Sequence, residues 1–153
     1  MIHNSSVIDK EAKISDNVKI GPFCYVGPNV ELSDDVELLS NIHIEGHTTI
    51  GKGTKIWHFT HIMPNCIIGK NCTLGQNVFI SSGVIVGDNT KIQNNVSLFD
   101  GVVCEENVFI GPSVVFTNVI NPRSEINRRS EFKKTQIKEG ATINKIDAIS
   151  IIH

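Results

Sequence analysis

Apolar residues recur at every sixth position along most of this chain. Counted from Ile2, each sixth residue as far as Phe116 is apolar, and the phase never changes. A second series lies four residues after each member of the first, runs from Ala12 to Val114, and holds only small or β-branched side chains. A six-residue period fits neither the turn of an α-helix nor the alternation of a simple strand. The pattern predicts a solenoid in which each hexad forms one short strand and a turn.

Three hexads would close one triangular coil of 18 residues. The large apolar residue then fills the interior, and the small residue sits where the wall bends. Glycine, Asn and Asp provide the unusual backbone angles at the corners. Because one coil cannot bury its apolar face alone, neighbouring coils must stack. We therefore expect an all-β fold, a left-handed parallel β-helix of hexapeptide repeats with one ejected loop.

The hexad pattern divides the chain into three parts. Residues 1–116 are expected to form the coils. Residues 117–136 are polar, contain Pro122 and carry five basic against two acidic residues, which predicts an ejected basic loop. Long loops in compact repeats are usually functional, although a solvated insertion would have the same composition. Hexads resume at Ile137, and residues 137–153 are expected to form a partial terminal coil without a cap, with Asp147 at an inward position.

The cysteines follow the same pattern. Cys24, Cys66 and Cys72 occupy the small inward position, and Cys104 occupies the large one. A free cysteine behaves as a small buried hydrophobe. Cys66 and Cys72 are the first and last residues of the segment CIIGKNC. Because successive hexads lie on different walls, their thiols would not converge on a metal. We predict four core thiols and no metal or redox pair.

Composition narrows the possible partners and the compartment. The chain has 153 residues, with 14 Lys plus Arg against 16 Asp plus Glu and a formal net charge of −2. This balance argues against a general nucleic-acid binder, which would carry a basic surplus. No apolar run approaches the roughly 18 residues of a membrane span, and the first residues contain no signal-peptide core. We expect a cytoplasmic protein with no membrane partner and with reduced thiols.

Polar residues spaced by one coil form two candidate columns on the outside. His58, Gln76 and Asn94 are 18 apart, so they should stack at the inter-strand step of about 4.8 Å. Asp100 and Asn118 form a second column, and Asn118 opens the ejected loop. Imidazole can act as a general base, and amides can position a substrate or stabilise an oxyanion. Plain solvation explains any one of these residues equally well; the two columns beside a basic loop favour a functional site.

No metal site is expected. Such a site needs about three ligands that meet in space. His58 and His61, three residues apart, do not supply them. The other histidines show no arrangement comparable to the columns: these are His3, His43, His47 and His153.

Specific strings point to a family. Residues 56–80 (IWHFTHIMPNCIIGKNCTLGQNVFI), 91–102 (KIQNNVSLFDGV) and 107–124 (NVFIGPSVVFTNVINPRS) resemble the hexapeptide-repeat N-acetyltransferases that act on nucleotide-linked 3-amino sugars. The nearest resemblance is to the UDP-2-acetamido-3-amino-2,3-dideoxy-glucuronate N-acetyltransferases of bacterial surface-polysaccharide synthesis. Residues 20–32 and 44–56 are similar instead to the opening coils of the acyl-carrier-protein-dependent UDP-N-acetylglucosamine O-acyltransferases.

The resemblance implies a homotrimer with active sites between subunits. It further implies acetyl-CoA as cofactor, a UDP- or dTDP-linked 3-amino sugar as partner, and direct attack of the sugar amine on the thioester, with no single essential base. Carried over by motif, the substrate-binding residues would be Gln76, Asn95, Asn118 and Arg123. The residues at the reacting centre would be Asn94, Asp100 and His58.

Two other interpretations stay open. Relatives continue past the string GATI with further glycine-bearing coils, whereas this chain reads INKIDAISIIH. A shortened, catalytically inactive β-solenoid remnant would explain that departure. The N-terminal resemblance alone would favour a sugar O-acyltransferase that uses acyl-carrier protein in place of CoA.

Overall fold

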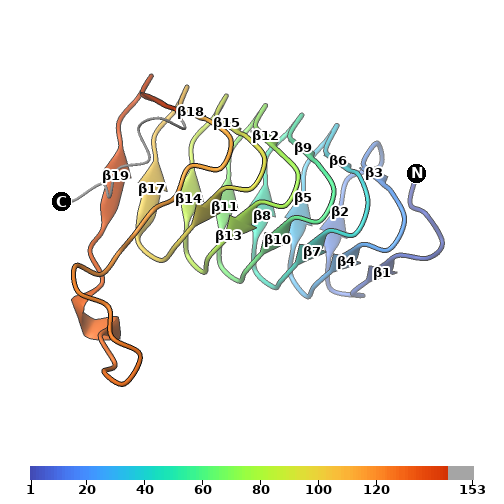
Figure 1. Ribbon diagram of the computed structural model, residues 1–153. Coiled ribbons are helices and arrows are strands. Elements are labelled where there is room, and N and C mark those ends of the chain that lie inside the picture. Colours follow the sequence, from blue (N-terminus) through green and yellow to red (C-terminus); the bar gives the residue numbers. More distant parts are fainter. Residues whose placement is uncertain (145–153) are drawn as a thin grey trace.

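The computed structural model describes residues 1–144, which form a three-walled β-solenoid (Figure 1). All strand pairs are parallel, and each strand pairs with the strand one coil away, for example His43 with His61 and Lys55 with Thr73. This register reproduces the predicted coil of 18 residues, so the parallel β-helix of hexapeptide repeats is confirmed. No helix within the described residues is both long and apolar enough to cross a membrane.

Each wall is named here after its first strand. The β1 wall has six strands: β1 (Val7–Ile8), β4 (Tyr25–Val26), β7 (His43–Ile44), β10 (His61–Ile62), β13 (Phe79–Ile80) and β16 (Ser97–Leu98). The β2 wall has seven: β2 (Lys13–Ile14), β5 (Glu31–Leu32), β8 (Thr49–Ile50), β11 (Ile67–Ile68), β14 (Ile85–Val86), β17 (Val102–Cys104) and β19 (Thr135–Ile137). The β3 wall also has seven: β3 (Lys19–Ile20), β6 (Glu37–Leu38), β9 (Lys55–Ile56), β12 (Thr73–Leu74), β15 (Lys91–Ile92), β18 (Phe109–Ile110) and β20 (Thr142–Ile143).

The interior is filled as the two apolar series predict. In the strands from β3 to β18 the last residue of each strand is buried; in the first two strands the last residues, Ile8 and Ile14, are only half-buried. The small series is buried from Val18 to Val114. The four cysteines belong to this core and are unpaired, as predicted. Burial raises the pKa of all four thiols, and for Cys104 it raises the pKa to about 12.

The corners adopt a backbone conformation that most residues avoid. Many corner positions have a positive φ, and Asn is the commonest residue there, as expected for a side chain that tolerates this region. Phe23 and Phe59 are bulky exceptions, with φ of 59° and 62°. Both belong to the corner that leads from the β3 wall to the β1 wall.

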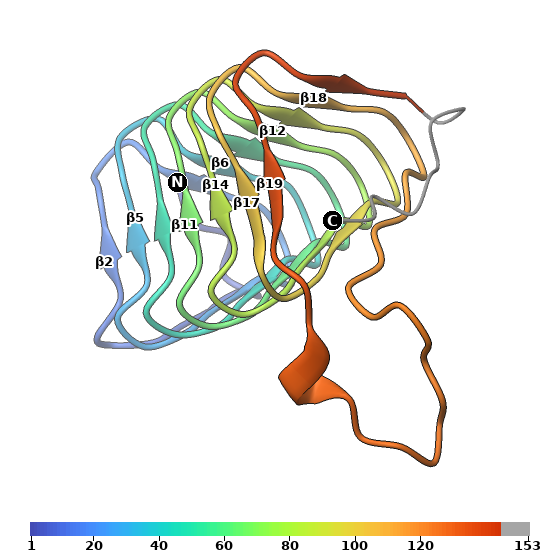
Figure 2. The same ribbon diagram turned by 90° about the vertical axis from the view of Figure 1, so that its left-hand side faces the viewer.

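The chain leaves the prism after the buried Phe116 and returns at β19 (Figure 2). Its neck is closed by a hydrogen bond from Lys133 N to Asn118 O (2.8 Å). The projecting segment contains one short 3₁₀ helix, η1 (Arg129–Glu131). The returning strand begins at Thr135, whereas the hexad count placed the return at Ile137; Thr135 N bonds to Gly101 O (3.0 Å), which extends the ladder to Val102. The expected inward position of Asp147, like the rest of 145–153, lies outside the described residues.

Candidate functional site

The first predicted column lies at the corner between the β3 wall and the β1 wall. His58, Gln76 and Asn94 each follow a strand of the β3 wall by two residues, and those strands pair in register. Asn94 Oδ1 accepts a hydrogen bond from Gln76 N (2.8 Å). A Cβ at Gly75 would lie only 2.6 Å from Asn94 Oδ1, so glycine at that position permits this close approach. The Asn94 oxygen is therefore used by the backbone, which leaves its NH₂ group for a ligand.

Asn95 stands beside Asn94 at the same corner. Its Oδ1 accepts a hydrogen bond from Asn77 Nδ2 (3.0 Å), and its backbone N–H donates to Gln76 O (2.9 Å). Its φ is 62°, so it also turns the corner. The structure thus gives Asn95 a role in holding the coil.

His58 is held by the preceding coil. Its Nδ1 lies 2.6 Å from Ser40 Oγ and accepts a hydrogen bond from Ser40 N (3.2 Å). Because a backbone N–H can only donate, Nδ1 of the neutral ring carries the lone pair, and the proton lies on Nε2. His58 therefore presents a donor, not a base, to its surroundings. It lines an open groove of about 640 Å³ whose wall is mostly apolar and also includes Leu39 and Ser40.

The second predicted column lies at the corner between the β1 wall and the β2 wall. Asp100 accepts a hydrogen bond from the buried Ser81 hydroxyl, and its side chain is otherwise exposed. Asn118 lies at the neck of the ejected loop and lines a pocket of about 420 Å³ together with Phe99, Thr117 and Ile120. Asn118 thus lines an apolar recess at the foot of the loop, and Phe99, the residue before Asp100, lines it as well.

Arg123 lies farther out, in the exposed part of the loop. Its Nη1 donates to Pro122 O (2.9 Å), and its backbone pairs with Ile126 in a tight turn. The guanidinium is exposed and makes no ion pair within the described residues. It is available to an anion, but nothing in one chain places it against either column.

The two columns do not meet within one chain. Asn94 and Asp100 are six residues apart, so they occupy equivalent positions at successive corners, with β16 between them. The columns therefore flank the two long edges of the β1 wall. Within one chain, the width of the β1 wall therefore separates the two columns.

A ring ladder that the sequence reasoning missed covers the outside of the β1 wall. Tyr25 stacks on His43 (ring centroids 4.6 Å apart), His43 meets His61 edge-on (5.1 Å), and His61 meets Phe79 (5.6 Å). Phe79 in turn lies 6.2 Å from Phe99. No outward strand residue of this wall is Lys, Arg, Asp or Glu. The spacing of 18 residues between the first four rings was the available signal, but it was applied only to corner residues.

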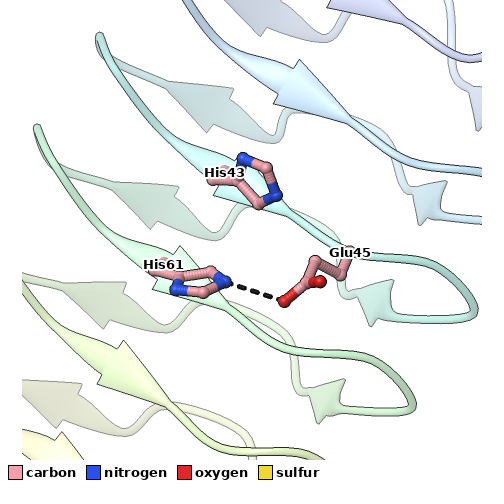
Figure 3. Close-up of side chains that lie close together, drawn as sticks. All are labelled: His43, Glu45 and His61. Atoms are coloured by element: carbon pink, nitrogen blue, oxygen red, sulfur yellow. Dashed lines mark hydrogen bonds and ion pairs between the residues drawn. The ribbon is translucent and has the colours of Figure 1, made fainter.

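His43 and His61 also share a carboxylate. Glu45 follows β7, and its Oε2 lies 2.8 Å from His61 Nε2 (Figure 3). One potential ligand atom from each of His43, Glu45 and His61 lies within 4.8 Å of the others. The register of β7 and β10 therefore brings together two histidines for which the sequence predicted no shared site.

The sequence comparisons identify one family. Residues 1–104 match the family model described as the GMPPB C-terminal domain. The match covers the first column and Asp100 but ends before Asn118 and Arg123. No curated protein sequence matches the chain significantly.

Solved structures share the fold at low sequence identity. One is GDP-perosamine N-acetyl transferase from Caulobacter crescentus, in complex with CoA and GDP-perosamine (TM-score 0.62, 16% identity, 95% of this chain and 52% of that chain). Another is UDP-N-acetylglucosamine O-acyltransferase from Moraxella catarrhalis (TM-score 0.57, 23% identity, 94% of this chain and 62% of that chain). A third is the N-acyltransferase AntD from Bacillus cereus, in complex with dTDP and coenzyme A (TM-score 0.57, 17% identity, 82% of this chain and 85% of that chain). The chain spans about half to three fifths of the length of the first two.

Proposed function

The chain belongs to the GMPPB C-terminal domain family, and from this premise we propose that it is an N-acetyltransferase for a nucleotide-linked amino sugar. It would transfer acetyl from acetyl-CoA to the 3-amino group of a UDP- or dTDP-linked sugar in surface-polysaccharide synthesis. The observation that carries the proposal is the placement of both polar columns along the edges of one wall whose outward strand residues include no Lys, Arg, Asp or Glu, with the basic loop leaving from one of these edges (Figure 2). Two structural neighbours support the same class: an N-acetyltransferase in complex with CoA and GDP-perosamine, and an N-acyltransferase in complex with dTDP and coenzyme A.

The proposal includes a homotrimer. Burying the outward rings of the β1 wall against another copy would remove apolar surface from water. The same packing would bring the Asp100 edge of one chain toward the Asn94 edge of the next. Two columns that lie apart in one chain would then line one cleft, and the loop with Arg123 would reach over it.

Asp100, Asn94 and His58 are suited to different parts of the acetyl transfer. The amine nitrogen would form the bond to the acetyl carbon as the carbon–sulfur bond breaks, and the departing CoA thiolate would take up the proton that the amine loses. Asp100 has one oxygen bonded to Ser81 and one left to accept that N–H. The NH₂ of Asn94 and the Nε2–H of His58 are donors suited to the oxyanion that develops.

The basic loop would hold the nucleotide. Arg123 offers a planar guanidinium that matches the geometry of phosphate oxygens. Five basic residues lie within residues 117–136, so the loop supplies a positive field for a diphosphate. Asn118 at its neck and Gln76 at the opposite corner would contact the sugar.

Release of the CoA thiol provides the test. Purified chain is incubated with acetyl-CoA and each of UDP-, dTDP- and GDP-linked amino sugars, and free thiol is measured with a chromogenic disulfide. The four protein thiols are buried, and burial raises their pKa, so the protein background should be small. Thiol release that depends on a 3-amino sugar nucleotide is expected. A folded, self-associated chain that consumes no acetyl-CoA with any acceptor would overturn the proposal.

A second candidate is a sugar O-acyltransferase that uses acyl-carrier protein. It is favoured by the overlap of 94% of this chain with the Moraxella O-acyltransferase, at 23% identity. The same assay separates the two candidates, because the O-acyltransferase would consume an acyl-carrier-protein thioester and a hydroxyl acceptor. If neither donor is bound or consumed, an inactive β-solenoid is the remaining interpretation.

A further inference from the structure

The outer face of the β1 wall carries a three-residue cluster with the chemistry of a transition-metal site. His43 lies on β7 and His61 on β10, and the two are direct partners in the parallel register. Glu45 is two residues after His43, so with Ile44 pointing inward both His43 and Glu45 point outward. Figure 3 shows the two imidazoles and the carboxylate grouped on this face of two neighbouring coils.

The rings that surround the cluster hold its imidazoles in place. Tyr25 is stacked on His43 with an interplanar angle of 26°, and Phe79 meets the edge of His61 at 68°. Each histidine therefore packs against an aromatic ring on the side away from the other histidine. Rings supported in this way lose little conformational freedom when they bind an ion.

We propose that His43, Glu45 and His61 bind one Zn²⁺ ion, which ties two neighbouring coils together and leaves one coordination position facing outward. Two imidazoles and one carboxylate are a ligand set that Zn²⁺ accepts, with a fourth position open to water or another donor. The proposal stands on this cluster alone and does not depend on acyl transfer.

The geometry requires only a small adjustment. Zinc–ligand bonds of about 2.0–2.1 Å in a tetrahedron place the ligand atoms roughly 3.4 Å apart. The three candidate atoms already lie within 4.8 Å of one another, so shifts of about an ångström bring them into place. Glu45 and His61 are only half-buried, and their contact of 2.8 Å would open as the ion takes the His61 Nε2 lone pair and any proton on that nitrogen leaves to solvent.

The competing explanation is a ring ladder with one surface ion pair. In that case His61 and Glu45 satisfy each other, His43 contributes only stacking, and no ion is bound. Surface ion pairs of this kind add little stability, so the two explanations predict different responses to metal.

Zinc titration of the whole chain separates them. The protein is prepared without a polyhistidine tag, treated with a chelator, and titrated with Zn²⁺ in a calorimeter. We expect one ion per chain with micromolar or tighter affinity, and a rise in Tm on adding Zn²⁺. The buried cysteines should not compete, because their thiols are neutral and shielded.

Variants locate the ion. His43→Ala and His61→Ala should each weaken binding by at least about tenfold, because even partners that only orient a ligand cost 10–100-fold when lost. Glu45→Gln keeps the shape of the side chain and should also weaken binding, which covers the case of a misfolded alanine variant. His47→Asn is the matched control, because His47 is an exposed corner histidine on the same coil outside the cluster.

Replacement of Zn²⁺ by Co²⁺ gives a second readout. Tetrahedral Co²⁺ should show visible absorption in the wild-type chain and the His47→Asn variant but not in His61→Ala. The proposal is overturned if the wild-type chain binds no Zn²⁺, or if His43→Ala and His61→Ala bind it as tightly as His47→Asn does.

Discussion

The β1 wall and the β3 wall have the same interior but opposite exteriors. Inside, both present large aliphatic residues at the second position of each strand, such as Ile80 and Ile56. Outside, the β3 wall carries a charged series in which Lys55 and Glu37 form an ion pair (3.6 Å). The outside of the β1 wall carries stacked rings and no charged strand residue apart from any protonated histidine. The hexad rule therefore governs the interior alone, and the outward residues distinguish a charged wall from one covered by rings.

The largest expected effect tests whether the two interiors are equivalent. Ile56→Ala in the β3 wall and Ile80→Ala in the β1 wall each remove a fully buried side chain. Each should lower the free energy of unfolding by about 3 kcal/mol, because lost transfer energy and a residual cavity both contribute. Chemical denaturation measures both. If one variant lost far more free energy of unfolding than the other, the interiors of the two walls would not be equivalent.

The interior should also accept a thiol only while it is neutral. Burial raises the pKa of Cys104 to about 12, against an ordinary value of 9.0. Between these values the unfolded chain ionises and the folded chain does not, so this part of the stability is present below pH 9 and is lost as the pH rises toward 12. The loss should be about 1.4 kcal/mol per pH unit.

Cys104→Val isolates that contribution. The other three thiols shift in the same direction, so the wild-type chain will lose stability in alkali for several reasons. The difference between wild type and variant, measured by denaturation from pH 8 to pH 11, should shrink or reverse above pH 9 in favour of the variant. A difference that stays constant across this range would contradict the assigned burial of Cys104.

Sequence reasoning predicted the interior almost completely. A six-residue period is a direct consequence of the coil geometry, so every buried hydrophobic position from Val18 to Phe116 could be assigned by counting. The same counting placed His58, Gln76 and Asn94 in one column. It also placed Asp100 in a second column on the adjoining face, but it could not show that the Ser81 hydroxyl donates a hydrogen bond to Asp100. It missed the pair His43 and His61 because strand positions were treated as plain wall.

Two corners with the same local structure offer a further comparison. Asn94 Oδ1 accepts from Gln76 N, and Asp88 Oδ1 accepts from Lys70 N, both at 2.8 Å. Only Asn94 borders the β1 wall; Asp88 lies at the corner between the β2 and β3 walls. Asn94→Ala and Asp88→Ala should each cost about 1 kcal/mol of stability, because each loses one such hydrogen bond.

The activities of these two variants should differ. If Asn94 donates to the developing oxyanion, Asn94→Ala should lower kcat for acetyl transfer by at least about 100-fold. Asp88→Ala should leave kcat unchanged, since it reports only the loss of the corner hydrogen bond. Equal activities in the two variants would remove Asn94 from the reacting centre while leaving its structural role intact.

The smallest expected effect concerns the corner beside the β1 wall. Phe59 has a φ of 62°, a conformation that costs energy for a bulky residue, and the residue is 57% exposed. Asn77 occupies the same corner position one coil later, with a φ of 56°. Phe59→Asn should therefore raise the free energy of unfolding by about 0.5–1 kcal/mol, since Asn tolerates this region and little apolar burial is lost. Asn77→Phe, the reverse change in the next coil, should lower it by more than this amount, because it also removes the hydrogen bond from Asn77 Nδ2 to Asn95 Oδ1. Both are measured by thermal and chemical denaturation.

A gain in stability combined with weaker substrate binding would mean that Phe59 is kept in a strained conformation for contact with a ligand or a second copy. A loss of stability in Phe59→Asn would instead show that packing around the ring outweighs the backbone cost, and that this corner is built like the interior and not like the exterior.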